Sequence, residues 1–159
     1  MSRLQLALNV DNLDESIAFY SKLFNAEPAK IRPGYANFAI TEPPLKLVLI
    51  ENPGQGGSLN HLGVEVADVD TVDAEQTRLA DAGFASIDER GTTCCYAKQD
   101  KFWVEGAPNS ERWEIYTVLA DSQTFFAPSE TDATCCVTDT AATTTEVAAV
   151  PAAQTAACC

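Results

Sequence analysis

The sequence predicts an α+β fold in which two copies of a βαβββ module pair to form a curved mixed sheet around one shared cavity. Three observations lead to this prediction: an alternating segment recurs at a fixed offset, a capped helical segment follows each copy of it, and further strand-like segments complete each copy. The first module spans about residues 3–55 and the second about residues 58–121, so that residues 1–121 form one domain.

The two opening strands are the clearest part of the repeat. Residues 4–10 and residues 60–66 both alternate between apolar and polar side chains, which is typical of strands that are buried on one face. At an offset of 56 residues Gln5 falls on His61, and the apolar positions of the two segments coincide. Pairing the copies about a pseudo-twofold axis predicts that Gln5 and His61 face each other.

A helix is predicted after each opening strand, because an Asp or Asn capping residue precedes a run with helical spacing. Asp11-Asn12 comes before the first run, and Asp68 comes before the second. The apolar residues of the two runs recur at helical intervals: Leu13, Ile17, Tyr20 and Phe24 in the first, and Val69, Val72, Leu79 and Ala82 in the second.

Further strands follow each helix, separated by clusters of Gly, Pro, Asn and Ser. They are predicted over residues 36–40 and 45–51 in the first module, and over residues 96–98, 102–105 and 111–119 in the second. From about residue 122 the composition changes to Ala, Thr, Asp and Cys without a sustained apolar period. Such a segment buries too little apolar surface to offset its ordering entropy, so residues 122–159 are expected to form a disordered low-complexity tail.

The charge of the chain argues against two classes of partner. The net charge is −13 with only 10 Lys and Arg residues, whereas nucleic acids and anionic membrane surfaces are bound through clustered basic residues. No apolar run approaches the roughly 20 residues that span a bilayer, and an alternating strand begins next to Met1, where a signal peptide would otherwise lie. These features predict a cytoplasmic protein that binds neither nucleic acid nor membranes.

The six cysteines occur only as adjacent pairs: Cys94-Cys95, Cys135-Cys136 and Cys158-Cys159. Adjacent cysteines bridge each other only through a strained ring, and thiols in the cytoplasm are expected to stay reduced. Two neighbouring thiolates suit one thiophilic centre, and Cys94-Cys95 follows a Gly/Thr stretch that predicts a loop. The residues alone leave open a second interpretation, in which these two cysteines are small buried apolar side chains.

A candidate metal site combines residues of three predicted strands. His61 is the only histidine of the chain and lies on the polar face of its strand, and Glu114 shares one face of a later strand with Tyr116. Gln5, His61 and Glu114 would supply an amide oxygen, an imidazole and a carboxylate, a variant of the facial triad of non-heme iron(II) sites. The alternative is that His61 is a hydrogen-bonded structural residue and Glu114 a solvated one.

The fourth position of this site carries no ligand. The counterpart of Glu114 in the first module is expected near Lys46 or Leu47, and neither side chain is a plausible metal ligand. A site with three protein ligands leaves positions for substrate or dioxygen, as catalytic metal sites require. The prediction is therefore one metal cavity shared by the two modules.

Together these motifs resemble the vicinal oxygen chelate superfamily, which includes glyoxalase I, bleomycin-resistance proteins and extradiol dioxygenases. More narrowly, they look like the iron-dependent C–As lyases that degrade trivalent organoarsenicals, and the similar cadmium-induced proteins share much of the pattern. The resemblance covers about residues 2–121 and rests on four segments that agree in order and spacing: residues 4–10, 60–65, 91–96 and 111–116.

The resemblance implies that Gln5, His61 and Glu114 hold Fe(II), for which other divalent metals can substitute, and that no catalytic residue is needed beyond these ligands. It also implies that Cys94 and Cys95 bind the As(III) of methylarsenite or an aromatic arsenical. Dioxygen would be consumed as the carbon–arsenic bond is cleaved and arsenite is released. The resemblance assigns no role to the two C-terminal cysteine pairs.

Two other functions stay open at this point. One is a cadmium- or arsenite-responsive protein that binds soft metals without turnover. The other is a glyoxalase-type metalloenzyme, which the vacant fourth ligand position disfavours because those enzymes usually carry four protein ligands. A homodimer is compatible with either function and with the C–As lyase.

Overall fold

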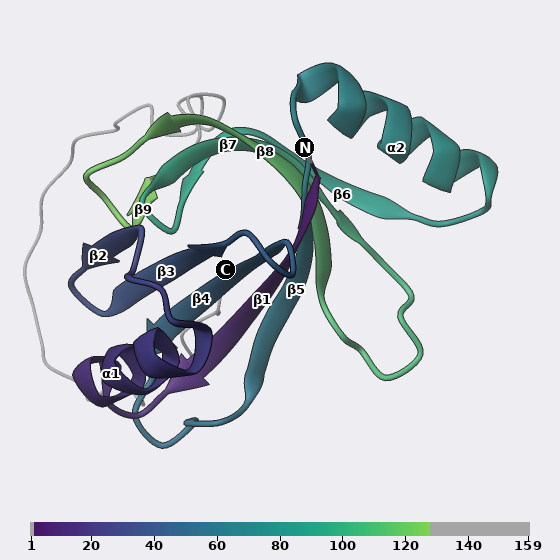
Figure 1. The fold of residues 1–159 in the computed structure, drawn as a ribbon. Helices are drawn as coiled ribbons and strands as arrows, with labels where there is room; N and C mark the ends of the chain where they lie inside the picture. Colours follow the sequence, from purple (N-terminus) through teal and green to yellow (C-terminus); the bar gives the residue numbers. More distant parts are fainter. Residues whose placement is uncertain (1, 128–159) are drawn as a thin grey trace, which may run out of the picture.

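The computed structural model describes residues 2–127, which form one nine-stranded sheet and two helices (Figure 1). In chain order the elements are β1 (Arg3–Val10), α1 (Leu13–Phe24), β2 (Lys30–Arg32), β3 (Tyr35–Ile40), β4 (Leu45–Glu51), β5 (Leu59–Glu65), α2 (Val69–Asp81), β6 (Ser86–Cys94), β7 (Ala97–Val104), β8 (Trp113–Asp121) and β9 (Phe126–Ala127). This composition confirms the predicted α+β class. Neither helix in this part of the chain is long and apolar enough to cross a membrane.

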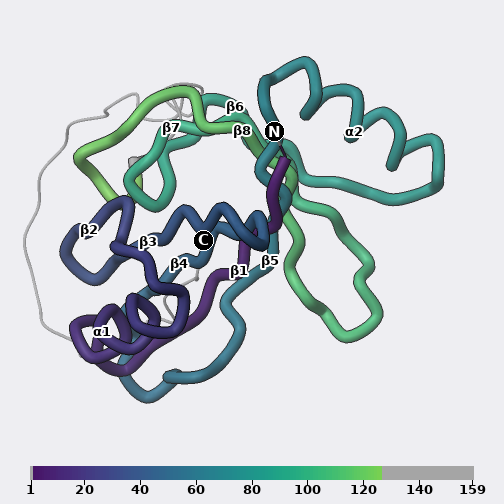
Figure 2. The backbone as a smooth tube through the Cα atoms, viewed as in Figure 1, coloured from purple at the N-terminus to yellow at the C-terminus, as the bar shows by residue number. Residues whose placement is uncertain are grey.

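The opening strands of the two modules lie side by side at the centre of the sheet, whose order is β2-β3-β4-β1-β5-β8-β7-β6-β9. β1 and β5 are antiparallel, while β1 is parallel to β4 and β5 is parallel to β8. The strands of module one lie on one side of the sheet and those of module two on the other, as the backbone trace in Figure 2 shows. The modules therefore meet along β1 and β5. The sheet is therefore mixed, as predicted.

The register of β1 against β5 establishes the internal repeat. Gln5 pairs with Gly63, and Ala7 pairs with His61. The offset of 56 residues that separates Gln5 from His61 also separates Ala7 from Gly63, so it exchanges one pair for the other. β1 and β5 are therefore related by a local twofold axis that passes between the two pairs.

The helices begin at the predicted caps and cover one face of the sheet. The side chain of Asn12 accepts a hydrogen bond from the backbone of Glu15 at 3.0 Å, and Asp68 accepts one from the backbone of Thr71 at 2.9 Å. The apolar side of α1 packs on the buried strand residues of module one: Val10, Ala36, Phe38, Ile40, Leu47 and Leu49. Helix α2 buries Val72 against the equivalent core of module two: Val66, Phe102 and Ile115. The opposite face of the sheet is left for the site.

Module two contains more strand than the sequence predicts. Strand β6 occupies the Gly/Thr stretch that was expected to be a loop, and the two strands predicted at residues 96–98 and 102–105 are one continuous strand, β7. The alternation of β7 is hard to see because its inward residues are the polar Gln99 and Lys101, both buried. Polar side chains that face a cavity look, in the sequence, like side chains that face water. Short β2 was missed as well.

The predicted tail begins too early. Within it, residues Phe126–Ala127 form β9, which pairs with Thr93 and Cys94 of β6. The ring of Phe125 packs against Tyr96 at 5.5 Å and against Tyr35 at 6.3 Å between ring centroids. Two adjacent aromatic residues thus give an otherwise polar segment enough apolar surface to dock. Residues 128–159, with the Cys135-Cys136 and Cys158-Cys159 pairs, lie outside the described residues.

The packing of Phe125 can be tested by comparison with its neighbour. Phe125→Ala removes two aromatic contacts at a half-buried site, so we expect it to lower the free energy of unfolding by about 1–3 kcal/mol. The matched control is Phe126→Ala, whose ring is 55% exposed and which should change stability by less than about 0.5 kcal/mol. Urea unfolding of both variants measures the difference, and equal stabilities would show that residues 122–127 do not dock.

Candidate functional site

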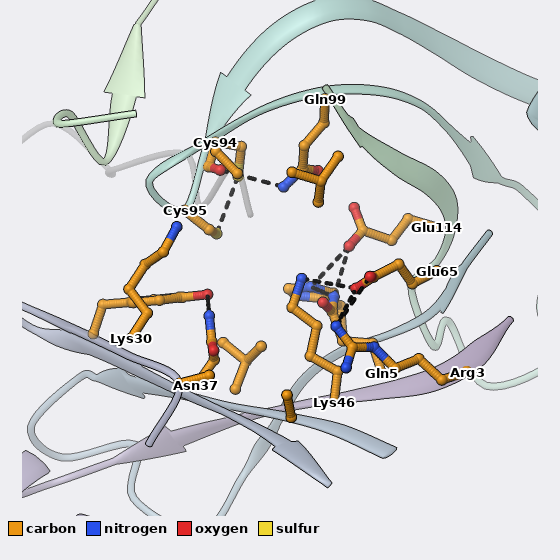
Figure 3. A pocket seen from close by; sticks show the side chains of 17 residues that line it. Arg3, Gln5, Lys30, Asn37, Lys46, Glu65, Cys94, Cys95, Gln99 and Glu114 are labelled. Carbon is orange, nitrogen blue, oxygen red and sulfur yellow. Dashed lines mark hydrogen bonds and ion pairs between the residues drawn. The ribbon is translucent and has the colours of Figure 1, made fainter. Parts of the chain in front are cut away.

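A cavity of about 220 Å³ lies between the two modules, on the face of the sheet opposite the helices. All five predicted site residues line it: Gln5, His61, Cys94, Cys95 and Glu114. Figure 3 shows the two cysteines at one side of the cavity and Gln5 and Glu114 at the other. The structure therefore brings the two predicted groups into one space without merging them.

Gln5, His61 and Glu114 converge to within hydrogen-bonding distance. Gln5 Nε2 lies 3.0 Å from His61 Nε2 and 2.7 Å from Glu114 Oε1, and the last two atoms are 3.4 Å apart. Each of the three residues is at most 5% exposed. Their strands explain this meeting: the β1–β5 pairing sets Gln5 opposite Gly63 and diagonal to His61 on the same face, and parallel β8 places Glu114 beside Gly63.

These distances suit the donors of one metal ion. Ligands that bind at about 2.1 Å and at right angles lie about 3.0 Å from one another, close to the separations of these three atoms. Gly63 keeps the space between them open, because a Cβ at this position would come within 3.2 Å of Gln5 Nε2 and 3.1 Å of Glu114 Cγ. No three His, Cys, Asp or Glu side chains within residues 2–127 gather as a metal-binding group, so a metal held here needs the amide of Gln5.

The amide of Gln5 now turns its nitrogen toward the other two residues, whereas a cation requires its oxygen. A half-turn of the amide, which exchanges its nitrogen and oxygen, would change the hydrogen bonds of the Tyr116 hydroxyl. Tyr116 Oη lies 2.6 Å from Gln5 Oε1 and 2.9 Å from Glu65 Oε2, and it accepts a hydrogen bond from Lys46 Nζ at 3.0 Å. A hydroxyl has one proton, so it cannot donate to both oxygens at once.

A half-turn of the amide resolves this competition. Gln5 Nε2 then donates to Tyr116 Oη, and Tyr116 gives its single proton to Glu65. The amide oxygen turns inward, beside His61 and Glu114. The surrounding network therefore fits a Gln5 that presents its oxygen to a cation.

The other two candidate ligands, His61 and Glu114, also have the protonation state that a metal ligand needs. His61 Nδ1 lies 2.7 Å from Asn60 Oδ1, which can only accept, so the proton sits on Nδ1 and the lone pair of Nε2 points to the centre. Lys101 Nζ donates to Glu114 Oε2 at 3.0 Å. Burial alone would raise the pKa of Glu114, but the positive charge of Lys101 above all lowers it, so the carboxylate is ionised at neutral pH.

These supporting residues follow from the structure and were not predicted. Lys101 is 2% exposed, and its charge is balanced by Glu114 and by Glu89 at 3.4 Å. Burial works to lower its pKa, but the two carboxylates raise it, so Lys101 stays protonated. Lys101 follows Gln99 by two residues, and residues two apart on a strand share one face. This spacing is the signal in the sequence that could have placed both residues on the cavity face.

The position equivalent to Glu114 in module one is Val48. Glu114 pairs with Gly63, the twofold axis exchanges Gly63 with Ala7, and Ala7 pairs with Val48. The expected position near Lys46 or Leu47 is therefore wrong by one or two residues, because β4 pairs with β1 in a register that places Val48 beside Ala7. The vacancy itself remains, since a valine side chain has no donor atom.

Cys94 and Cys95 lie at the turn between β6 and β7, not in a loop. Cys94 pairs with Ala97, and the two residues between them, Cys95 and Tyr96, have φ angles of 55° and 61°. Positive φ at both central positions is the geometry of a type I′ hairpin turn, which side chains other than Gly and Asn adopt only under strain.

Several contacts hold this turn in place. The backbone of Cys95 donates to the carbonyl of Phe125 at 2.7 Å, and the carbonyl of Tyr96 accepts from Lys30 Nζ at 3.0 Å. Tyr96 Oη donates to the carbonyl of Pro33 at 3.0 Å. The turn of module two is therefore anchored on both module one and the segment after β8.

The sulfur atoms of the two cysteines lie 3.2 Å apart, which is not a bonded distance. Cys94 takes part in a disulfide bond, so the expectation of a reduced thiol is wrong for Cys94 in this structure. Burial, and then the negative charge of Glu114, raises the pKa of the Cys95 thiol to about 12. A thiol with this pKa keeps its proton at neutral pH, and two neighbouring sulfurs remain able to share one thiophilic centre once Cys94 is reduced.

Comparison with known proteins supports the family to which these features point. The Glyoxalase/Bleomycin resistance protein/Dioxygenase superfamily matches residues 3–115. Cadmium-induced protein CadI of Mycobacterium tuberculosis is 70% identical over 79% of this chain and 82% of its own. A trivalent organoarsenical cleaving enzyme of Thermomonospora curvata is 56% identical over 86% of this chain and 89% of its own. An extradiol ring-cleaving dioxygenase of B. fuscum shares the fold, with a TM-score of 0.53 at 16% identity over 76% of this chain and 34% of its own.

The three convergent residues should differ in their effect on metal affinity. We expect His61→Ala to abolish the binding of Fe(II) or Co(II) and Glu114→Ala to do nearly the same, because three ligands leave little redundancy. Gln5→Ala should weaken binding less, because a neutral amide is the poorest ligand of the set. Calorimetric titration under argon measures all three affinities. Full affinity in His61→Ala would place the metal elsewhere.

Tyr116 should affect metal binding through the orientation of Gln5. Tyr116→Phe removes the acceptor that the inward-turned amide needs, so we expect the affinity for Co(II) to fall about tenfold. The matched control is Tyr35→Phe, a second buried tyrosine of the cavity whose hydroxyl bonds Asn37. It should leave the affinity within about twofold, and an equal loss in both variants would count against the positioning role.

Proposed function

Because the chain belongs to the glyoxalase/bleomycin resistance protein/dioxygenase superfamily, we propose that it is an enzyme of this superfamily that cleaves the carbon–arsenic bond of trivalent organoarsenicals. Its substrates would be methylarsenite and trivalent aromatic arsenicals, and arsenite would be released. The names of relatives at 56% and 42% identity support this chemistry. The observation that carries the proposal is a single cavity with a three-residue donor set at one side and two vicinal cysteines at the other.

The donor set fits a non-heme iron site. Fe(II) held by Gln5, His61 and Glu114 would supply the activation of dioxygen, and other divalent ions could occupy the same ligands. Lys101 keeps Glu114 ionised, and Asn60 keeps the lone pair of His61 directed at the centre. Val48 leaves the fourth position open for the reactants.

The cysteines fit the capture of trivalent arsenic. In the reduced protein, two thiols and a dihydroxy-arsenical condense to two As–S bonds, and each thiol proton leaves with an arsenic-bound hydroxyl as water. The high pKa of Cys95 matches this reaction, because the thiol brings the proton that the hydroxyl requires. A reducing compartment such as the cytoplasm would keep both thiols available.

The cavity then places the organic substituent near the metal ligands. Arsenic fixed by Cys94 and Cys95 shares one cavity with Gln5, His61 and Glu114, so its carbon substituent would meet the reacting centre without a bimolecular encounter. Five small apolar side chains lie among the polar residues of the wall and leave room for the substituent: Ala29, Ala39, Val48, Ala97 and Val118.

A second candidate is a soft-metal-binding protein without turnover. The 70% identity to cadmium-induced protein CadI favours it, and the two sulfur atoms at 3.2 Å could bind Cd(II) or arsenite as well as an organoarsenical. A glyoxalase-type reaction is less well supported, because Val48 offers no fourth ligand. Release of arsenite from methylarsenite distinguishes turnover from binding alone.

The division between metal ligands and substrate ligands leads to the main test. Reduced protein is loaded with Fe(II) and mixed with methylarsenite in air-saturated buffer, and free arsenite is followed. We expect steady release by the wild type and a loss of at least about 100-fold in Cys94→Ser and in Cys95→Ser. Affinity for Fe(II) should change less than about threefold in both variants, because hard and soft centres use different ligands.

Other outcomes would exclude parts of the proposal. Tight binding of methylarsenite without arsenite release would favour the soft-metal-binding protein. Loss of iron affinity in the serine variants would show that the thiols are metal ligands. Pentavalent methylarsenate serves as the control substrate, and it should stay intact because it lacks affinity for thiols until it is reduced.

A further inference from the structure

One buried polar atom of the cavity has no partner. The carbonyl oxygen of the Gln99 side chain, Oε1, is fully buried and makes no hydrogen bond, while the residue as a whole is 5% exposed. Among residues 2–127 only two other buried side-chain atoms share this condition, on Ser21 and Arg32, and neither residue lines the cavity. Leaving a buried acceptor without a donor is unfavourable, so its place beside the site needs a cause.

The orientation of this amide is fixed by its neighbour. Gln99 Nε2 donates to the backbone carbonyl of Cys94 at 3.3 Å, and a carbonyl can only accept. Exchanging the amide nitrogen and oxygen would therefore set two acceptors against each other. The unpartnered atom is an acceptor, and whatever satisfies it has to bring an N–H or O–H group.

The backbone directs Gln99 to this place. The pairing of β7 with β8 shifts register between Lys98 and Gln99, and such bulges re-aim side chains next to binding sites. Two side-chain donors at this side of the cavity already have partners within the protein: Asn37 Nδ2 donates to Tyr35 Oη at 2.8 Å, and Lys30 Nζ donates to the carbonyl of Tyr96 at 3.0 Å. Among the described residues that line the cavity, Gln99 carries the fully buried acceptor without a partner, adjacent to Cys94 (Figure 3).

We propose that Gln99 forms a subsite for the organic substituent of the arsenical and recognises an amino or hydroxyl group on an aromatic ring. This inference rests on the proposed function. Arsenic held by both thiols has lost its hydroxyl groups, so the donor has to come from the carbon substituent. The cavity of about 220 Å³ has room for such a group, since benzene fits a cavity of about 150 Å³. The substrate class is then arylarsenites that carry a hydrogen-bond donor.

The test compares three arsenicals on the full-length reduced protein under argon, where no turnover occurs. Calorimetry gives the dissociation constants of phenylarsenite, 3-aminophenylarsenite and 4-aminophenylarsenite. We expect at least one amino compound to bind about five- to tenfold more tightly than phenylarsenite. Gln99→Met, which keeps the length of the side chain without its acceptor, should abolish this preference and leave the affinity for phenylarsenite within about twofold.

The exposed Gln55 supplies the matched control, since Gln55→Met should keep the full preference. Equal affinities of the wild type for the three compounds would overturn the subsite, as would a preference that persists in Gln99→Met. If Gln99→Met fails to fold, the affinities of the wild type for the three compounds still test the subsite. Failure of the wild type to bind any of the three compounds would instead overturn the proposed function, and the subsite with it.

Discussion

The antiparallel pairing of β1 with β5 is the constraint on which the rest of the structure depends. Its register opposes Gln5 to Gly63 and Ala7 to His61, and it thereby creates the twofold axis that relates the modules. A shift of one residue would turn Gln5 and His61 to the helix-covered face. The parallel pairing of β8 with β5 places Glu114 beside Gly63 and so brings it to the axis as well. Two strand pairings that share β5 thus fix the place of three side chains that lie far apart in the sequence.

Placing these side chains on the axis means burying charge, and the network around them limits its cost. Lys101 neutralises Glu114, and Lys46 lies 3.1 Å from Glu65, whose other oxygen is paired with Arg3. Removing one member of such a pair leaves an uncompensated buried charge and costs more than the pair itself contributes. The candidate ligands are therefore held by their neighbours such that only the Gln5 amide has to turn, which allows an ion to bind without rearrangement of the backbone.

The site residues could be predicted from the sequence where the alternation of polar and apolar residues shows which face of the sheet a polar side chain occupies. Gln5, His61 and Glu114 were predictable because regular alternation with apolar neighbours assigns them a face, and the repeat then opposes the faces. Lys101 and Gln99 were missed, because β7 carries polar residues on its buried side and its sequence resembles that of a solvent-exposed segment. The docking of Phe125 depends on rings that lie in other parts of the chain, Tyr35 and Tyr96, and no local pattern reveals them.

The two modules differ in the hairpin turn at which the proposed substrate site lies. Their hairpins β2–β3 and β6–β7 both turn through two residues, Pro33-Gly34 in the first and Cys95-Tyr96 in the second. Proline fixes φ near −65°, and Gly34 has a φ of 69°, as in a relaxed type II turn, whereas Cys95 and Tyr96 both hold positive φ. The turns also touch, through the hydroxyl of Tyr96 and the carbonyl of Pro33. The turn of module one, which is free of strain, thus supports the strained turn that carries Cys95, and the contact depends on the twofold arrangement that also brings the candidate metal ligands together.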